Sequence, residues 1–186
     1  RLFAAFLESL RRYPAGMSYR PVLIQKGFTP DFVHPLTKSW STPDRCAPEI
    51  VNVSDQGQAL TAFRKAAEVV DSRLLLFFTS YSRVLASDWL IKLYSAYMSL
   101  GPGSLIGASG SWEALGVHTT FPNVTIRTNA FLIERARFLF FSHPLDAKRD
   151  GNLFEAGPNS MTRIIRSAGG RVAIVDRDGR VIEPDD

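Results

Sequence analysis

Apolar residues recur along this chain at two spacings, one typical of helices and one of buried strands. Phe3, Phe6 and Leu10 fall on one helical face and Pro14 ends the pattern, so the sequence predicts a helix over residues 1–13. The same spacing predicts further helices at residues 59–70, 87–100 and 158–168 and around Phe138. Short apolar runs predict buried strands that begin at Val22, Ile50, Leu74, Leu105, Ala130 and Val172.

The connections between these elements are also visible in the pattern. Residues 29–48 are rich in Pro, Ser and Thr without a sustained period, which predicts a long surface connection. Asp178-Gly179 before Val181 and Ile182 is typical of a hairpin turn.

Strands that alternate with amphipathic helices predict one domain over residues 1–186, a three-layer α/β sandwich with a mostly parallel central sheet. We expect helices on both faces. The strands expected in that single sheet begin at Val22, Ile50, Leu74, Leu105 and Val172.

Composition narrows the class of protein. The 22 basic and 18 acidic residues are spread along the chain, without the dense basic tract typical of nucleic-acid binding. The longest apolar run, Leu74–Phe78, is too short to span a membrane, although peripheral association with a membrane stays open. The single Cys46 fits a reducing compartment, which predicts a cytoplasmic protein.

In parallel sheets, ligands bind beyond the carboxyl ends of the strands. The segments that matter for function are therefore the four that follow predicted strands: residues 25–28, 54–57, 79–83 and 109–113.

The run Leu74–Arg83, followed by Asp88-Trp89-Leu90 and then Gly103–Ala108, resembles the nucleotide-sugar glycosyltransferases of the GT-A fold. The closest likeness is to the large inverting group that elongates polysaccharides. The resemblance extends from Arg1 to about Val175. That family places a strand before its opening helix, so the resemblance implies a first strand that would precede residue 1.

Two family features are missing. The family ends its central strand in an Asp-x-Asp pair that holds a divalent cation, but Thr79-Ser80-Tyr81-Ser82 stands there. Two acidic residues and a Gly usually end another strand, and here Gln25-Lys26-Gly27 keeps only the glycine. We therefore expect no cofactor, and we expect Mn²⁺ or Mg²⁺ to bind weakly or not at all.

The resemblance still implies a donor site for a nucleotide sugar. Its candidate residues are Lys26, Gly27, Asp55, Ser80, Ser82 and Arg83. Without a metal, basic side chains or helix N-termini must offset the diphosphate charge, and the candidate side chains are Lys26, Arg83, Arg127 and Arg149. The alternatives are ordinary surface charges for these cations and a helix cap for Asp55.

Glu155 matches the family's general base, the carboxylate that deprotonates the acceptor hydroxyl, because it stands just before the predicted helix 158–168. Its alternative role is a helix-start carboxylate. Trp112, Arg127 and Asn129 are the candidate contacts for a glycan or lipid-linked acceptor. The three histidines lack the spacing of metal ligands, so the sequence predicts no metal site.

Two functions of different classes stay open. The first is a transferase in polysaccharide biosynthesis that moves a hexose from a nucleotide sugar to an acceptor hydroxyl, with Glu155 as base. The second is a catalytically inactive binding or accessory domain of the same fold. A nucleotidyltransferase or another α/β enzyme is a more distant alternative.

Overall fold

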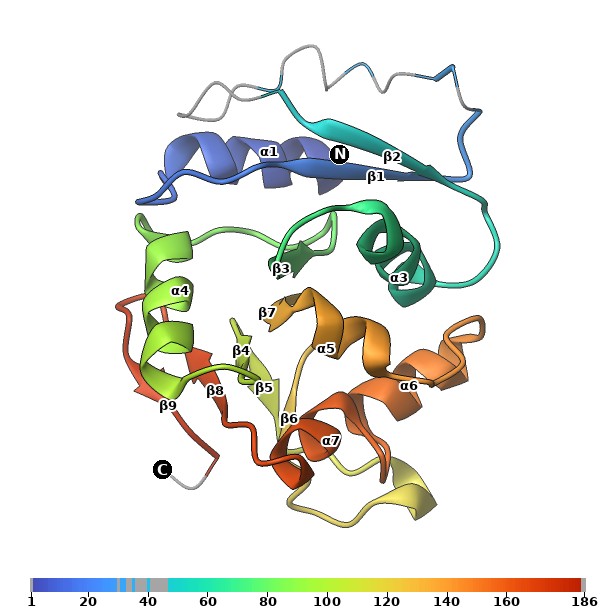
Figure 1. Ribbon diagram of the computed structural model, residues 1–186, viewed down its shortest axis with the longest axis vertical. Helices are drawn as coiled ribbons and strands as arrows, with labels where there is room; N and C mark the ends of the chain where they lie inside the picture. Colours follow the sequence, from blue (N-terminus) through green and yellow to red (C-terminus); the bar gives the residue numbers. More distant parts are fainter. Residues whose placement is uncertain (1, 30, 33–34, 36–39, 41–46, 185–186) are drawn as a thin grey trace.

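The structure is a computed structural model that describes residues 2–29, 31–32, 35, 40 and 47–184. Cys46 and most of the long connection predicted over residues 29–48 lie outside this part of the chain. Strands and helices alternate, and the helices cover a sheet from two sides (Figure 1), which confirms the α/β class.

The chain begins with a helix and a small parallel sheet. The elements are α1 (Leu2–Arg12), β1 (Val22–Lys26), β2 (Glu49–Val53) and α3 (Ala59–Val69). β1 and β2 pair in parallel along their whole length, from Val22 opposite Glu49 to Lys26 opposite Val53. They form a sheet of their own among the described residues.

The central sheet has five strands in the order β3-β7-β4-β8-β9. Their bounds are β3 Leu74–Phe78, β4 Leu105–Gly107, β7 Ala130–Glu134, β8 Val172–Val175 and β9 Val181–Ile182. β4 and β8 are parallel, whereas β7 runs antiparallel to both β3 and β4 and β9 antiparallel to β8. β3, β4 and β8 therefore point one way.

This topology corrects the prediction of one mostly parallel sheet. The strands that begin near Val22 and Ile50 lie in a separate sheet, and the central sheet is mixed. Residues 130–133 are buried on both faces of the sheet, and such a run has the same pattern in either direction. Hydrophobicity alone therefore could not orient β7.

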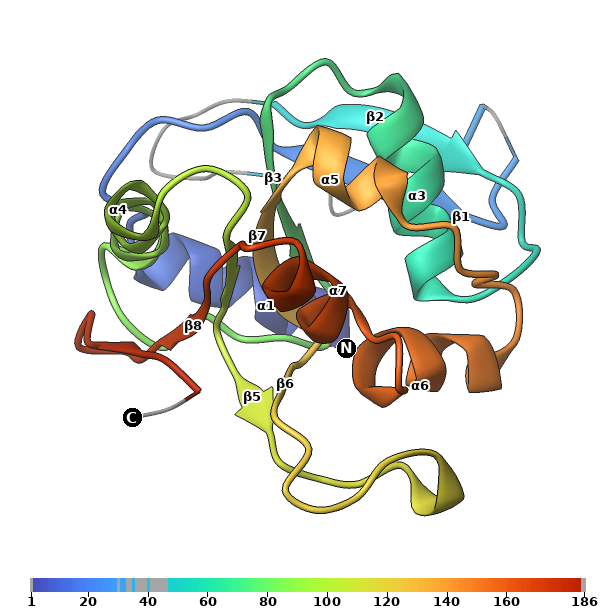
Figure 2. The ribbon, with the colours of Figure 1, turned by 60° about the horizontal axis from the view of Figure 1, so that its bottom comes forward.

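Helices cover both faces of the central sheet, as expected (Figure 2). The remaining helices are α4 (Trp89–Leu100), α5 (Arg135–Phe140), α6 (Lys148–Ala156) and α7 (Met161–Ser167). Alternate residues of β7 serve the two faces: Phe131 and Ile133 pack with α3, α5, α6 and α7, whereas Leu132 packs with α4.

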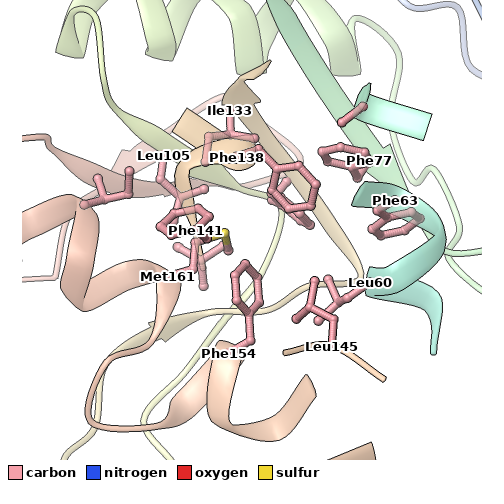
Figure 3. Close-up of a cluster of buried hydrophobic side chains, with 14 of the residues drawn as sticks. Leu60, Phe63, Phe77, Leu105, Ile133, Phe138, Phe141, Leu145, Phe154 and Met161 are labelled. Atoms are coloured by element: carbon pink, nitrogen blue, oxygen red, sulfur yellow. The ribbon is translucent and has the colours of Figure 1, made fainter. Parts of the chain in front are cut away.

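Aromatic rings fill the larger core (Figure 3). The rings of Phe63 and Phe77 are stacked with centroids 4.7 Å apart, and Phe138 lies 4.7 Å from Phe77. Phe154 adds edge-on contacts to Phe138 and Phe141 and is fully buried. Phe154 thereby fixes α6, the helix that carries Glu155, to the core.

One helix boundary differs from the prediction, and one segment has a structure that the residue pattern did not indicate. Helix α7 begins at Met161, after a Ser160 whose hydroxyl caps Arg163 N, so Pro158 lies outside it. The Gly/Ser-rich segment after β4 forms a hairpin of β5 (Gly110–Ser111) and β6 (Thr125–Ile126), with a 3₁₀ turn at Gly116–His118 between them.

Among the described residues, no helix has the length and apolar composition needed to cross a bilayer.

Replacing Phe154 with Ala should lower the free energy of unfolding by about 3–5 kcal/mol, because it leaves a large cavity among packed rings. The measurement is urea denaturation followed by circular dichroism. Phe140, which is 79% exposed, provides the matched control, and Phe140→Ala should cost less than about 0.5 kcal/mol. Equal losses in the two variants would contradict this account of the core.

A second structural contact joins α4 to the end of β7. The Tyr97 hydroxyl donates to Glu134 Oε1 at 2.5 Å, and the Gly103 amide donates to the same oxygen at 3.3 Å. The Tyr97 hydrogen bond lowers the pKa of Glu134 below its ordinary 4.5, against the effect of burial. Because the folded carboxyl has the lower pKa, this contact stabilises the protein above about pH 4.5.

Tyr97→Phe should therefore cost about 1.5–3 kcal/mol at pH 7, the usual range for a hydrogen bond to a charged group. The difference from the parent protein should shrink as the pH falls from 4.5 through the lowered pKa of Glu134, since both proteins then carry a neutral carboxyl. Urea denaturation at several pH values between pH 7 and pH 3 measures this difference in the free energy of unfolding. A difference that stays constant over this range would refute the linkage.

Candidate functional site

The mixed topology brings three loops to one edge of the central sheet. Phe78 pairs with Ala130 and Gly107 pairs with Phe131, so the carboxyl ends of β3 and β4 lie beside the start of the antiparallel β7. The segments 79–83, 108–111 and 127–129 therefore meet at this edge, which we call the ligand edge. Two of the three follow predicted strands and were expected to carry function.

Asn129 ties these loops together. Its carbonyl accepts from Thr79 N at 3.0 Å and from the Ser82 hydroxyl at 2.9 Å. Its side-chain Oδ1 accepts from the Ser109 hydroxyl at 2.8 Å. Ser82 is 8% exposed, so its hydroxyl is used inside the protein. Ser82 and Asn129, both predicted ligand contacts, are thus brought together in a role that shapes the edge.

Glu155 lies beside the same edge and is held by three donors. The amide and the hydroxyl of Thr128 donate to Oε2, each at 2.7 Å, and Arg127 Nη1 donates to Oε1 at 2.9 Å. The Glu155 side chain is 16% exposed. A carboxylate has about four acceptor positions, so these bonds leave roughly one, on Oε1, for a ligand.

The place of Glu155 in the chain also differs from the prediction. It stands in the last turn of α6, Lys148–Ala156, and not directly before the next helix. Because Glu155 lies in the last turn of a helix, it is not a helix-start carboxylate. The partial negative charge at a helix carboxyl terminus disfavours an acidic side chain at this position. The hydrogen bonds that Arg127 and Thr128 donate to Glu155 offset this unfavourable interaction with the helix dipole.

Arg127 connects two carboxylates. Besides the bond to Glu155, its Nη2 donates to Glu113 Oε2 at 2.8 Å. The hydrogen bond to Glu155, partly opposed by desolvation, raises the pKa of the Arg127 guanidinium. Arg127, Glu155 and Glu113 form what we call the acceptor-side cluster.

Lys26, Gly27 and Asp55 meet at the ends of β1 and β2. The Lys26 ammonium donates to the Asp55 backbone carbonyl and to its Oδ1 at 2.8 Å, and this hydrogen bond lowers the pKa of Asp55. Gly27 has φ +77°, and a Cβ there would lie 2.7 Å from Asp55 Oδ1. Asp55 is not a helix cap, because α3 is capped at Gln58.

Further predicted donor-site residues surround a cavity of about 770 Å³ between β1 and β3. Lys26 and Ser80 line it at the ends of the two strands, together with two aromatic side chains, Phe28 and Tyr81. Phe28 is 44% and Tyr81 61% exposed, and Phe28 stacks on Phe32 at 4.4 Å. Arg83 is directed back onto its own loop, where Nη1 donates to the carbonyls of Tyr81 and Ser82.

Two candidates lie apart from these groups. Trp112 is 65% exposed at the end of β5, one residue before Glu113, so it neighbours the acceptor-side cluster without a described contact to Arg127. Arg149 lines a separate groove of about 330 Å³ beside the 3₁₀ turn. Arg149 is therefore not part of the ligand edge.

Phe28, Tyr81 and Glu113 were not predicted individually as site residues, although the segments 25–28, 79–83 and 109–113 that contain them were expected to carry function. The hairpin register that places Glu113 near Arg127 comes from β5 and β6, two strands of two residues each, which are too short for a hydrophobic pattern. Phe28 and Tyr81 follow predicted strands, and their position was the available signal.

Within the described ranges, no group of three or more His, Cys, Asp or Glu side chains is placed to hold a metal ion. A cation that bridges a diphosphate requires clustered oxygen ligands.

No protein-family model and no curated protein matches this sequence.

Removing the Glu155 carboxylate should destabilise the protein, because the Thr128 amide and the Arg127 guanidinium lose their acceptor. We expect Glu155→Ala to cost about 1–3 kcal/mol in urea denaturation. Glu113→Ala is the matched control: its side chain is 76% exposed, so its loss should cost less than about 1 kcal/mol. A Glu155→Ala variant as stable as the parent would show that this carboxylate is not a structural anchor.

Proposed function

We propose that this chain is a glycosyltransferase-like α/β domain that binds a nucleotide sugar and does not transfer its sugar. The observation that carries the proposal is the state of Glu155, whose carboxylate already accepts three hydrogen bonds from Thr128 and Arg127. A general base needs lone pairs directed at the substrate hydroxyl, and most of those on Glu155 are engaged within the protein.

Two of the four cationic candidates, Lys26 and Arg127, are already paired with carboxylates, which also supports binding without transfer. Lys26 is paired with Asp55, and Arg127 is paired with Glu155 and Glu113. Charge that develops on a leaving diphosphate needs strong compensation, from a metal or from several cations. Paired cations can bind a diphosphate but offer little additional stabilisation in a transition state.

Binding is supported by the groups around the cavity. Phe28 and Tyr81 are exposed aromatic side chains on which a nucleobase can stack. Lys26 and Ser80 line the same cavity and supply donors suited to phosphate oxygens. Stacking surfaces beside phosphate donors are the combination that binding of a nucleoside diphosphate requires.

A transferase is the second candidate, and one observation favours it. Oε1 of Glu155 accepts only the Arg127 bond among the described contacts, so an acceptor hydroxyl of a glycan or lipid-linked substrate could still approach this oxygen. In that case Glu155→Gln would lower turnover by on the order of a hundredfold to ten-thousandfold.

The binding experiment is a thermal-shift and calorimetric screen of nucleotide sugars, with and without Mn²⁺. A ligand at roughly 100 times its dissociation constant should stabilise the protein by about 2.7 kcal/mol. Tyr81→Ala should weaken this binding by about 1–3 kcal/mol through lost stacking. Arg149→Ala, outside the ligand edge, is the control and should leave the affinity unchanged. Unchanged affinity in Tyr81→Ala, or no binding of any nucleotide sugar, would refute the proposed site.

Release of nucleoside diphosphate in the presence of mixed glycan acceptors distinguishes the two candidates. The binding proposal expects no release above the buffer background. Release that depends on acceptor and falls in Glu155→Gln, at equal folded fraction, would establish the transferase instead.

A further inference from the structure

Three large apolar side chains are exposed on one short segment, the connection between β5 and β6. Trp112 is 65%, Val117 98% and Phe121 74% exposed. Apolar residues scattered singly over a surface need no explanation, but three within residues 112–121 are a cluster. Figures 1 and 2 both show this segment reaching outward beyond the sheet. We call residues 112–122 the finger.

The outer part of the finger carries almost no charge. Residues 114–122 contain no Asp, Glu, Lys or Arg, and His118 is the only titratable side chain among them. Glu113, at the base, is paired with Arg127 at 2.8 Å. A segment without unpaired charge leaves water at a lower cost in free energy than a charged one.

The finger is held in place by Asn123, which is fully buried at its base. The Asn123 amide donates to the Trp112 carbonyl at 2.9 Å. Its side-chain Nδ2 donates to the carbonyls of Glu113 and Ala156, and its Oδ1 accepts from Arg163 Nη2 at 3.0 Å. Bonds from α6 and α7 therefore fix the finger, so little ordering is needed before its exposed side chains bind a partner.

Hydrogen bonds within the finger also satisfy part of its backbone. The Leu115 amide donates to the Thr119 hydroxyl at 2.7 Å, and the His118 amide donates to the Leu115 carbonyl at 2.9 Å. Backbone groups that already have partners cost less to remove from water than free ones. The tip of the finger is thus suited to burial in a less polar medium.

Basic side chains lie beside the finger. Arg149 lines the groove of about 330 Å³ together with Val117, and the described residues around this groove include no carboxylate. Lys148 and Arg149 are both exposed in the first turn of α6, and Asp150 in the same turn accepts from the Ala147 amide. The positive end of the helix dipole disfavours cations in a first turn, so helix stability does not account for them.

The shape and chemistry of the finger favour a bilayer over a folded partner. A protein that binds a protruding segment needs a complementary pocket, whereas the headgroup region of a bilayer accepts a protrusion without one. Trp and Phe side chains are favoured at this interface. Basic side chains beside them are attracted to anionic lipids. Together, an uncharged aromatic tip and a basic flank fit an anionic lipid surface.

We propose that the finger inserts Trp112, Val117 and Phe121 into the interface of an anionic lipid bilayer, while Lys148 and Arg149 contact its phosphate headgroups. Because Trp112 directly precedes Glu113, the bilayer then lies next to the acceptor-side cluster, where a lipid-linked molecule could reach it. The inference rests on the exposure and charge of the finger, and it does not depend on the proposed function.

The test is sedimentation of this chain with vesicles of phosphatidylcholine, with and without added phosphatidylglycerol. The chain should sediment with the anionic vesicles, and less so at high salt. Replacing both Val117 and Phe121 with Ser should weaken partitioning by at least about tenfold, because their apolar surface no longer leaves water. The matched control replaces Leu85 and Phe140, which are 70% and 79% exposed elsewhere, with Ser and should bind like the parent.

The basic flank and the tip are tested separately. Lys148→Ala and Arg149→Ala should each weaken binding to anionic vesicles by about fivefold and leave binding to neutral vesicles unchanged. The fluorescence of Trp112 should shift to shorter wavelength on anionic vesicles. Trp112→Phe should abolish this shift, although Trp40 and Trp89, both half-buried, are still present.

Three results would overturn the proposal. The first is the absence of binding to anionic vesicles by the folded parent chain. The second is an equal loss of binding in the finger variant and in the Leu85/Phe140 control, or binding that depends on charge alone and persists in the finger variant. The third is a dimer, without vesicle binding, that is lost in the finger variant, which would assign the finger to contact with a second copy of the chain.

Discussion

β7 is hydrogen-bonded on both sides, to β3 and to β4, and it runs against both of them. Because of this direction, the segment that enters β7 lies beside the segments that leave its neighbours. Asn129 can then accept from Thr79, Ser82 and Ser109, and Arg127 and Thr128 can reach Glu155. In a sheet with β7 reversed, Arg127 would lie at the opposite edge, and the candidate site would not form.

The charges at the ligand edge are balanced within the protein. Lys26 faces Asp55, and Arg127 bridges Glu113 and Glu155. Exposed pairs such as Lys26–Asp55 contribute little to stability, since solvent screens them and ordering both side chains costs entropy. Glu155 differs because it is mostly buried and accepts a backbone amide as well. Under the proposed function, these pairs serve to bind a polar ligand and not to stabilise new charge in a reaction.

Much of the fold follows from residue patterns, because helices and buried strands need apolar residues at fixed spacings. The helices at 59–69 and 89–100 and the strand 74–78 were predicted nearly to their ends. The direction of β7 was not predicted. Its residues 130–133 are buried on both faces, so they have no polar face that would indicate how the strand pairs with its neighbours. Helix α6 was missed because Asp150, Gly151 and Asn152 weaken its local propensity, and it depends on the burial of Phe154.

The sequence predicted where in the fold the candidate site lies better than it predicted which side chains contact one another there. The rule that ligands bind beyond the carboxyl ends of strands led to the prediction of Lys26, Ser80 and Arg83 as site residues. These residues lie where the strands end. The partners of these residues could not be read from sequence, because ion pairs such as Arg127–Glu155 join segments 28 residues apart and depend on the register of short strands. Ser82 is a further example. The sequence predicted that its hydroxyl contacts a ligand, but in the structure this hydroxyl is buried and donates to the Asn129 carbonyl.

The most direct test of the proposed binding site is a map of backbone amide shifts by nuclear magnetic resonance during titration with a nucleotide sugar, without metal. We expect the perturbed amides to cluster in residues 26–28, 79–83 and 127–129, with saturation at a single dissociation constant. Perturbations centred on the groove that contains Arg149, or no saturable perturbation, would contradict the assignment of the ligand edge.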